Sequence, residues 1–163
     1  MNMKEYLEKI LQAQVYEVAK KTPLEKANNL SNTLKNNIYL KREDHQDVFS
    51  FKIRGAYNKM RQLTKEELSN GVITSSAGNH AQGVALTCNT LKLNHDIFVP
   101  ENTPNQKIDR IKHFGGNYLT LHRYGQTFDE CLYKSINHCN QNNALFVHPF
   151  NDNDIILGQG TIA

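Results

Sequence analysis

The chain of 163 residues is long enough for one compact domain, or for a small domain with part of a second. Hydrophobic residues make up 39% and charged residues 21%, and the formal net charge is only +3. Without a dense stripe of Lys and Arg, this balance argues against nucleic acid as a partner. No stretch approaches the roughly eighteen consecutive apolar residues of a membrane-spanning helix, so we expect no membrane partner either.

The cysteines are odd in number and form no C-x-x-C pair: they are Cys88, Cys131 and Cys139. This pattern indicates free thiols in a reducing compartment. The N-terminal residues are amphipathic and lack the apolar core and cleavage site of a signal peptide. We therefore expect the protein in the cytoplasm.

The first third of the chain predicts few regular elements. Apolar residues at three-to-four spacing predict a helix from Met3 to Lys20, which Pro23 ends. The polar segment NNLSNTLKNN, residues 28–37, is typical of a loop, and IYLKR, residues 38–42, is a short strand candidate.

The next segment, DVFSFKIRGAYNKM, predicts a helix with Ser50 as its N-cap. This places Lys52 in the first turn, between the apolar Phe51 and Ile53. The positive field of a helix start disfavours a cation, so the amine shifts toward its neutral, nucleophilic form. A lysine taken alone is more often a solvated surface residue.

From residue 72 strands and helices alternate regularly. The strand candidates are VITS, DIFVP, NYLTLHR and ALFVHPF. Thr103 with Pro104 predicts one helix start, Gly115-Gly116 its end, and Thr127 with Glu130 a capping box at the next helix. This order predicts an α/β unit with a parallel sheet, flanking helices and right-handed crossovers.

The segment TSSAGNHAQG, Thr74 to Gly83, follows a strand and opens a helix. Such a turn exposes backbone N–H groups at a positive helix start, which suits a carboxylate or phosphate. Asn79 and His80 add side-chain donors there. The competing interpretation is a tight strand-to-helix turn with Asn79 as its cap.

Taken together, SFKIRGA and SSAGNHAQG resemble the signatures of the fold-type-II pyridoxal-phosphate enzymes, in the threonine/serine dehydratase branch. LKRED, VHPF and GQGTIA are similar to the same family, so the resemblance covers residues 22–163. It implies a tryptophan-synthase-β-like α/β architecture and pyridoxal 5'-phosphate as cofactor. The implied reaction converts L-threonine to 2-oxobutanoate and ammonia, with L-serine as a second substrate, as in isoleucine biosynthesis.

The resemblance also implies residue roles. Lys52 would hold the cofactor covalently and act as the catalytic base, Phe51 would pack near the cofactor ring, and Asn79 would bind its phenolic oxygen. The substrate carboxylate would bind the loop of Ser76, Ala77, Gly78, Asn79 and His80. The partner is thus a small amino acid, and the full-length enzyme is expected to be a homo-oligomer.

The chain looks like the N-terminal part of such an enzyme. In the family, the glycine-rich phosphate loop and the partner of the pyridine nitrogen lie beyond the position of Ala163. We expect residues 1–66 to begin the large cofactor domain and residues 67–151 to form the small substrate domain. Residues 152–163 would start the return to the large domain.

Two other functions stay open, and two other kinds of binding site are set aside. A serine racemase would carry a serine where Ala77 stands, and a catalytically inactive truncated domain is a second rival. The segment from Gly158 to Ala163 fits a dinucleotide fingerprint, but the acidic residue that should follow is missing. The histidines, scattered along the chain, show no zinc-ligand spacing, so no metal site is expected.

Overall fold

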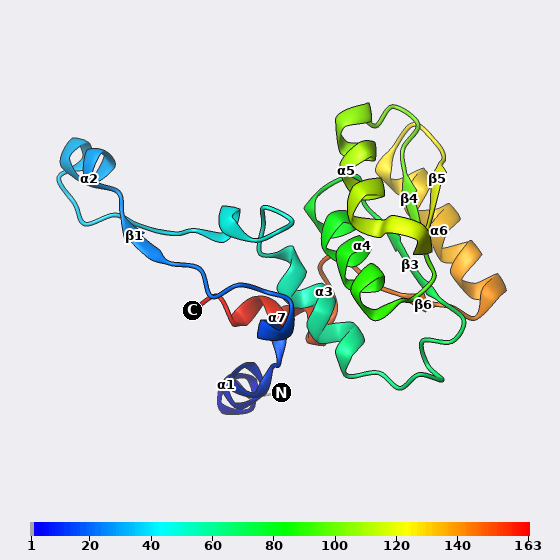
Figure 1. Ribbon diagram of the computed structural model, residues 1–163, viewed down its shortest axis with the longest axis horizontal. Helices are drawn as coiled ribbons and strands as arrows, with labels where there is room; N and C mark the ends of the chain where they lie inside the picture. Colours follow the sequence, from blue (N-terminus) through cyan, green and yellow to red (C-terminus); the bar gives the residue numbers. More distant parts are fainter. Residues whose placement is uncertain (1) are drawn as a thin grey trace.

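The computed structural model describes residues 2–163, and its central element is a four-stranded parallel sheet in the order β5-β4-β3-β6. The strands are β3 (Val72–Ser75), β4 (His95–Val99), β5 (Leu119–Arg123) and β6 (Leu145–Phe146). The helices that connect them are α4 (Asn79–Leu91), α5 (Asn105–Gly115) and α6 (Phe128–Asn142). The predicted parallel α/β architecture with flanking helices is therefore confirmed (Figure 1).

Helices cover both faces of this sheet. Ile97 of β4 is fully buried in a cluster with Ala81 of α4 and Ile108 of α5. The next residue, Phe98, points to the opposite face and packs with Cys131 of α6. A strand covered on both faces is apolar along its length, which is why these strands were visible in the sequence as short apolar runs.

Helices α3 (Lys52–Arg61) and α7 (Asn153–Gly160) cross closely beside the sheet. A Cβ atom added at Gly158 would lie 2.6 Å from the carbonyl oxygen of Arg54 and 2.7 Å from the Cα of Gly55. Only glycine allows the two backbones to approach this far. Ile155 and Leu157 of α7 are buried, so the apolar end of the chain is part of the packed structure.

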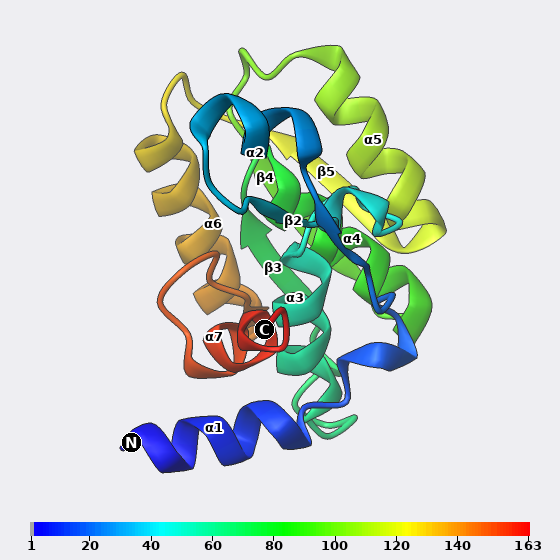
Figure 2. The same ribbon diagram turned by 90° about the vertical axis from the view of Figure 1, so that its left-hand side faces the viewer.

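An arm projects from the rest of the molecule (Figure 1), and we use this name for residues 24–41. It contains β1 (Leu24–Lys26), α2 (Asn28–Leu34) and β2 (Tyr39–Lys41), and its two strands pair antiparallel. Its leucines are exposed, for example Leu24 at 64% and Leu34 at 57%. Figure 2 shows the arm end-on, in front of the sheet.

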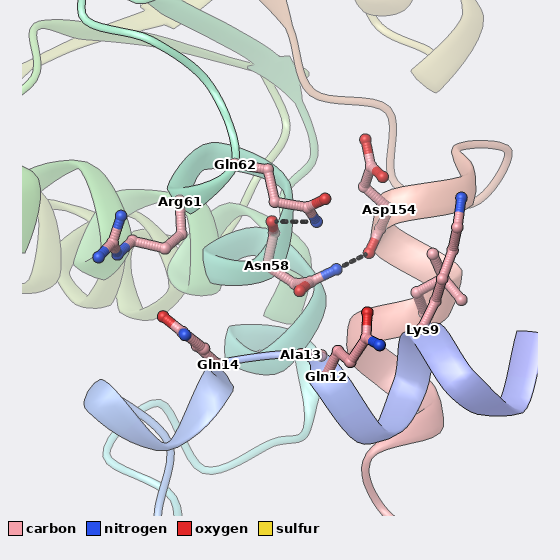
Figure 3. A pocket seen from close by; sticks show the side chains of 9 residues that line it. Lys9, Gln12, Ala13, Gln14, Asn58, Arg61, Gln62 and Asp154 are labelled. Carbon is pink, nitrogen blue, oxygen red and sulfur yellow. Dashed lines mark hydrogen bonds between the residues drawn. The ribbon is translucent and has the colours of Figure 1, made fainter.

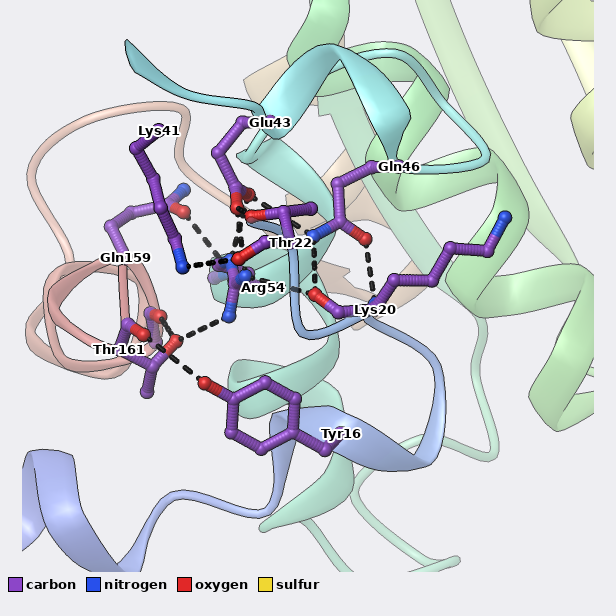
Figure 4. A network of polar contacts seen from close by, with 11 residues as sticks. Tyr16, Lys20, Thr22, Lys41, Glu43, Gln46, Arg54, Gln159 and Thr161 are labelled. Atoms are coloured by element: carbon purple, nitrogen blue, oxygen red, sulfur yellow. Dashed lines mark hydrogen bonds and ion pairs between the residues drawn. The ribbon is translucent and has the colours of Figure 1, made fainter. Parts of the chain in front are cut away.

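A buried polar network joins the base of the arm to α3 (Figure 4). The guanidinium of Arg54, which is fully buried, donates from Nε and Nη2 to the two carboxylate oxygens of Glu43, each at 2.8 Å. Thr22 Oγ1 donates to the same carboxylate at 2.5 Å, and Arg54 Nη1 donates to Thr161 Oγ1 at 3.2 Å. The Arg54–Glu43 pair thus connects Thr22, which precedes the arm, with Glu43, which follows it, and with Thr161 after α7.

Two predictions about the first third of the chain are wrong. The first helix, α1 (Met3–Gln12), ends eight residues early, and the chain turns into the 3-10 helix η1 (Val15–Glu17). Val15 is fully buried in the core there, so tertiary packing overrides the helical periodicity. The segment expected to be a loop forms α2, whose only sequence signal is the pair Leu30 and Leu34 at i,i+4 spacing.

The helix-capping predictions have mixed outcomes. The capping box of Thr127 and Glu130 is present with both of its hydrogen bonds. Helix α5 ends at Gly115, and Gly116 follows at φ 55°, as the Gly-Gly pair predicted. At the start of α5 the N-cap is Pro104 instead of Thr103, and no side chain caps the helix. The remaining 3-10 turns are η2 (Glu43–His45) and η3 (Gly116–Tyr118).

The helices and the cysteines can be compared with what the sequence suggested. Within residues 2–163, no helix is both long and apolar enough to cross a membrane. All three cysteines are free and buried, and burial raises the pKa of the Cys88 thiol above its ordinary value. These thiols behave as small apolar side chains of the core.

Candidate active site

Lys52 is the first residue of α3, and the chain reaches it through a sharp bend. Phe49, three residues earlier, adopts the left-handed backbone conformation at φ 57°, which bulky residues rarely do. The predicted N-cap, Ser50, is wrong: the N-cap is Phe51, and no side chain caps the helix. The hydroxyl of Ser50 is buried and has no hydrogen-bond partner among the described residues.

The amine of Lys52 lies between two aromatic rings that are themselves partly exposed to solvent. Its Nζ lies 5.6 Å from the ring centroid of Phe51 and 5.2 Å from that of Phe150, and it donates to the carbonyl oxygen of Pro149 at 3.1 Å. Burial lowers the pKa of Lys52 below its ordinary value. The amine is therefore more readily neutral and nucleophilic than a surface lysine, in the direction expected from the sequence, but the cause is burial and not the field of the helix start.

The loop from Ser76 to His80 joins the end of β3 to the start of α4. Gly78 is the N-cap of α4, and no side chain caps this helix. The N–H groups of the first helical turn, from Asn79 onward, have no intrahelical partner. They face outward at the positive end of the helix and can bind a carboxylate or phosphate oxygen.

His80 points inward from this loop. Its Nε2 lies 3.2 Å from the carbonyl oxygen of Val147, so Nε2 carries the proton and donates it. Nδ1 is then a bare acceptor, buried and without a partner in residues 2–163. Burial lowers the pKa of His80 to about 4, with a further contribution from the charge of Lys52. The expected side-chain donor is thus directed to Val147 and not to the loop.

Helix α4 brings this loop and Lys52 together. A Cβ atom at Gly83, one turn into α4, would lie 3.0 Å from the carbonyl oxygen of Lys52. The start of α4 and the start of α3 are therefore in direct backbone contact, which only a glycine permits. The helix that carries Lys52 and the helix that follows the loop are therefore direct neighbours.

A surface pocket of about 360 Å³ lies beside the loop. Its lining residues come from the starts of α4 and α5: Gly78, Asn79, Gln82, Gln106, Lys107 and Arg110. Two cationic side chains beside a helix N-terminus strengthen the attraction for an anion. Asn79 is exposed on this side of the loop, where its amide is free to contact a bound molecule.

A second pocket, of about 350 Å³, lies elsewhere, between α1, α3 and α7 (Figure 3). Asn58 Nδ2 donates to the Asp154 carbonyl oxygen at 2.7 Å in its wall, and Gln62 donates to the Asn58 carbonyl oxygen. None of the site residues predicted from the sequence lines it. It is a gap at a helix junction, away from the reactive amine.

The sequence did not predict the contacts of the segment VHPF with Lys52. His148 Nδ1 accepts hydrogen bonds from the N–H groups of Phe150 and Asn151, and this turn places the Pro149 carbonyl beside the amine. Phe150 supplies the second aromatic wall. VHPF stood out only as part of the family resemblance, and no local spacing connects it with a residue 97 positions earlier.

These residues fit pyridoxal phosphate on the side of the cofactor that they can reach. The amine, whose pKa is lowered by burial, suits a covalent bond to an aldehyde, and the uncapped start of α4 suits an anionic group. The buried, partnerless Nδ1 of His80 and the hydroxyl of Ser50 are further polar atoms close to the same helix starts.

Comparison with known proteins gives consistent results. The chain is 48% identical over 159 residues to a biosynthetic L-threonine dehydratase from Burkholderia multivorans, covering 98% of this chain and 31% of the relative. It is 49% identical over 158 residues to the chloroplastic biosynthetic threonine dehydratase 2 of Solanum lycopersicum, covering 97% of this chain and 26% of that protein. The chain thus spans about a third of the length of the curated relatives it matches.

Solved structures show the same similarity. The processed form of threonine deaminase isoform 2 from Solanum lycopersicum superimposes with a TM-score of 0.91 at 47% identity, covering 99% of this chain and 45% of that one. A serine racemase from Dictyostelium discoideum gives 0.85 at 30% identity, covering 96% and 50%. The family model described as pyridoxal-phosphate dependent enzyme matches residues 15–163. The chain therefore belongs to the family of pyridoxal-phosphate dependent enzymes.

Proposed function

We propose that the protein deaminates L-threonine to 2-oxobutanoate and ammonia, with L-serine as a second substrate. The observation that carries the proposal is the Lys52 amine, which lies between the rings of Phe51 and Phe150 on a helix whose backbone start contacts α4, the helix that follows the anion-receptive loop. A base near a carboxylate site is what proton removal from an amino acid requires. The relatives named threonine dehydratase support the choice of substrate.

Three residues would hold the cofactor. Lys52 would bind it covalently through Nζ, Phe51 would pack against its ring, and Asn79 would hydrogen-bond its phenolic oxygen. When bound, pyridoxal phosphate supplies an electron sink for the carbanion that forms at the substrate α-carbon.

The chain's own groups would then move the substrate and its proton. In the loop from Ser76 to His80, the N–H groups of Ser76 and Gly78 already donate to other groups, so those of Ala77, Asn79 and His80 would orient the substrate carboxylate. Lys52 Nζ would accept the α-proton, for which its lowered pKa suits it. The β-hydroxyl leaves with a proton as water, and water later replaces the nitrogen, so threonine yields one 2-oxobutanoate and one ammonia.

Ala77 favours elimination over racemisation. In the family, a racemase carries a serine at this position, and the hydroxyl protonates the opposite face of the substrate. The methyl group of Ala77 transfers no proton, and this residue lies within the substrate loop. The racemase relatives are also less similar, at 30% identity against 47% for the threonine deaminase.

The wider setting is also a proposal. We propose the division into residues 1–66, 67–151 and 152–163, with the last segment returning to the first through the contact of α7 with α3. We further propose a homo-oligomer in the full-length enzyme, a location in the cytoplasm and a role in isoleucine biosynthesis. The word biosynthetic in the names of the relatives supports that role.

The direct experiment locates the reactive amine. Purified protein is mixed with pyridoxal phosphate, its visible absorbance is recorded, the adduct is reduced with borohydride, and the peptides are mapped. We expect one modified residue, Lys52. Modification of another lysine, or of many surface lysines equally, contradicts the assignment.

Replacement of the lysine tests the chemistry. Lys52→Ala in the full-length enzyme should lower threonine deamination at least about 1000-fold, because both the covalent tether and the base are lost. Lys112→Ala, an exposed lysine on α5, is the matched control and should retain activity. Circular dichroism checks that both variants fold. Ammonia release by a folded Lys52→Ala variant at the rate of the control rules out the mechanism.

A further inference from the structure

Three potential metal ligands meet on the face of the sheet that α6 covers. They are Asp96 of β4, His122 of β5 and His138 of α6, and one ligand atom from each lies within 4.8 Å of the others. Asp96 Oδ1 is 2.5 Å from His122 Nε2 and 3.9 Å from His138 Nε2. No metal site was expected from the sequence because the histidines show no zinc-ligand spacing, and this cluster indeed depends on the fold and not on spacing along the chain.

The sheet register explains why they meet. Asp96 pairs with Thr120 and Phe98 pairs with His122, so Asp96 and His122 are diagonal neighbours on one face. Residues two apart on a strand share a face, and on β4 this is the face opposite Ile97 and the α4–α5 layer. Helix α6 packs on that face and supplies His138.

The aromatic ring of Phe98 orients both imidazoles. The ring of His122 stacks on it with centroids 4.3 Å apart and an interplanar angle of 10°, and the ring of His138 lies 5.3 Å from it. Ring positions fixed by packing reduce the conformational entropy lost when the imidazoles bind an ion. The amine of Lys134, one turn before His138, is directed to the ring of Tyr124, at 5.4 Å.

We propose that Asp96, His122 and His138 form a site for a divalent transition-metal ion, with Zn²⁺ as the ligand of first choice. Two imidazoles and one carboxylate are ligands that zinc accepts, and they leave a fourth position for water. Donor atoms around a tetrahedral zinc ion lie roughly 3.3 Å apart, given bond lengths of about 2.0–2.1 Å. The separations of 2.5 and 3.9 Å lie on either side of that value, and the third pair of donor atoms lies within 4.8 Å, so the three side chains must shift slightly to bind one ion together.

The site is open to solvent and to the ion. The three side chains retain 30 to 32% of their exposure, so Zn²⁺ can enter without unfolding. An ion bound there would join α6 to β4 and β5, three elements contributed by separate parts of the chain. An ion that binds only the folded state raises stability with the logarithm of its concentration over its dissociation constant.

Zinc titration of the untagged chain tests the proposal. Competition with a chromophoric zinc indicator should show one ion per molecule, and saturating Zn²⁺ should raise the thermal unfolding midpoint by roughly 5 °C. His138→Ala should weaken binding at least about tenfold and abolish the shift in the midpoint. His113→Ala, which removes an exposed histidine from α5, is the matched control and should leave both unchanged.

Asp96→Asn is the second variant, because it preserves the size of the side chain. It should weaken Zn²⁺ binding as His138→Ala does, which separates loss of a ligand from damage to α6. Equal zinc affinity in the wild type and both variants overturns the proposal, as does the absence of saturable binding. A Co²⁺ spectrum with a thiolate charge-transfer band also overturns it, since the proposed ligands contain no sulfur.

Discussion

The sheet with α3 to α7, here called the body, and the arm of residues 24–41 are stabilised in different ways. In the body, side chains such as Ile97 and Val84 are fully buried between layers. In the arm the large apolar side chains are exposed, and its attachment depends on the buried Arg54–Glu43 pair at its base. A packed apolar core tolerates changes in side-chain packing, whereas a bidentate ion pair requires one relative orientation of its two side chains. The direction of the arm therefore depends on a few specific hydrogen bonds.

The largest effect is expected where the two regions join. Arg54→Met leaves the carboxylate of Glu43 buried without its cation, which should cost about 3–5 kcal/mol of unfolding free energy. Urea denaturation measures the loss. The matched control is Arg42→Met, which breaks the partly exposed pairs with Glu25 and Asp44. Equal losses of unfolding free energy in the two variants would mean that the buried Arg54–Glu43 pair contributes no more to stability than a surface ion pair.

A second effect lies inside the body and depends on pH. The folded-state pKa of His80 is lowered by burial from 6.5 to about 4. The unfolded chain therefore binds a proton between these values and the folded chain does not, so stability is complete above pH 6.5 and falls as the pH is lowered toward 4. The loss should reach about 3 kcal/mol over this range.

His80→Gln isolates this contribution, because its amide can still donate to the Val147 carbonyl but does not titrate. Urea denaturation at pH 7 and at pH 4.5 gives the pH dependence of each protein. The variant should lose less stability than the wild type over that interval. If the unfolding free energies of the wild type and of His80→Gln depend on pH identically, groups other than His80 take up the proton.

The smallest effect is expected in the arm. Leu34→Ser should change the unfolding free energy by less than about 0.5 kcal/mol, because the side chain is 57% exposed. Ile97→Ala, in the central strand, should cost about 2–5 kcal/mol in the same measurement. A large loss from Leu34→Ser would show that the arm packs against something in solution, and the contrast between the two regions would disappear.

The sequence predicted what depends on local pattern. The strands from Val72 to Phe146 are short apolar runs between turn signals, and the capping box at Thr127 is a four-residue motif. The amine of Lys52 and the loop at Gly78 were likewise visible, because a lysine at a helix start and a small-residue turn are local features.

Contacts between distant residues were not predictable in this way. Thr22, Glu43 and Arg54 form one network only because the residues just before the arm and just after it both lie beside α3. Asp96, His122 and His138 have no ligand spacing along the chain, and the strand register alone brings two of them together. Helix α2 was missed for another reason: its polar composition hides a helix whose leucines are not buried.

The crossing of α3 and α7 has a consequence for the order of assembly during translation. The N–H of Gly55 donates to Gln159 Oε1 at 3.3 Å, across 104 residues of chain. At usual elongation rates the ribosome needs roughly 5 to 20 seconds to make that interval. For this time the helix that carries the reactive lysine has no α7 to dock on. The nascent polypeptide therefore forms the crossing of α3 with α7 only after residue 159 has been made.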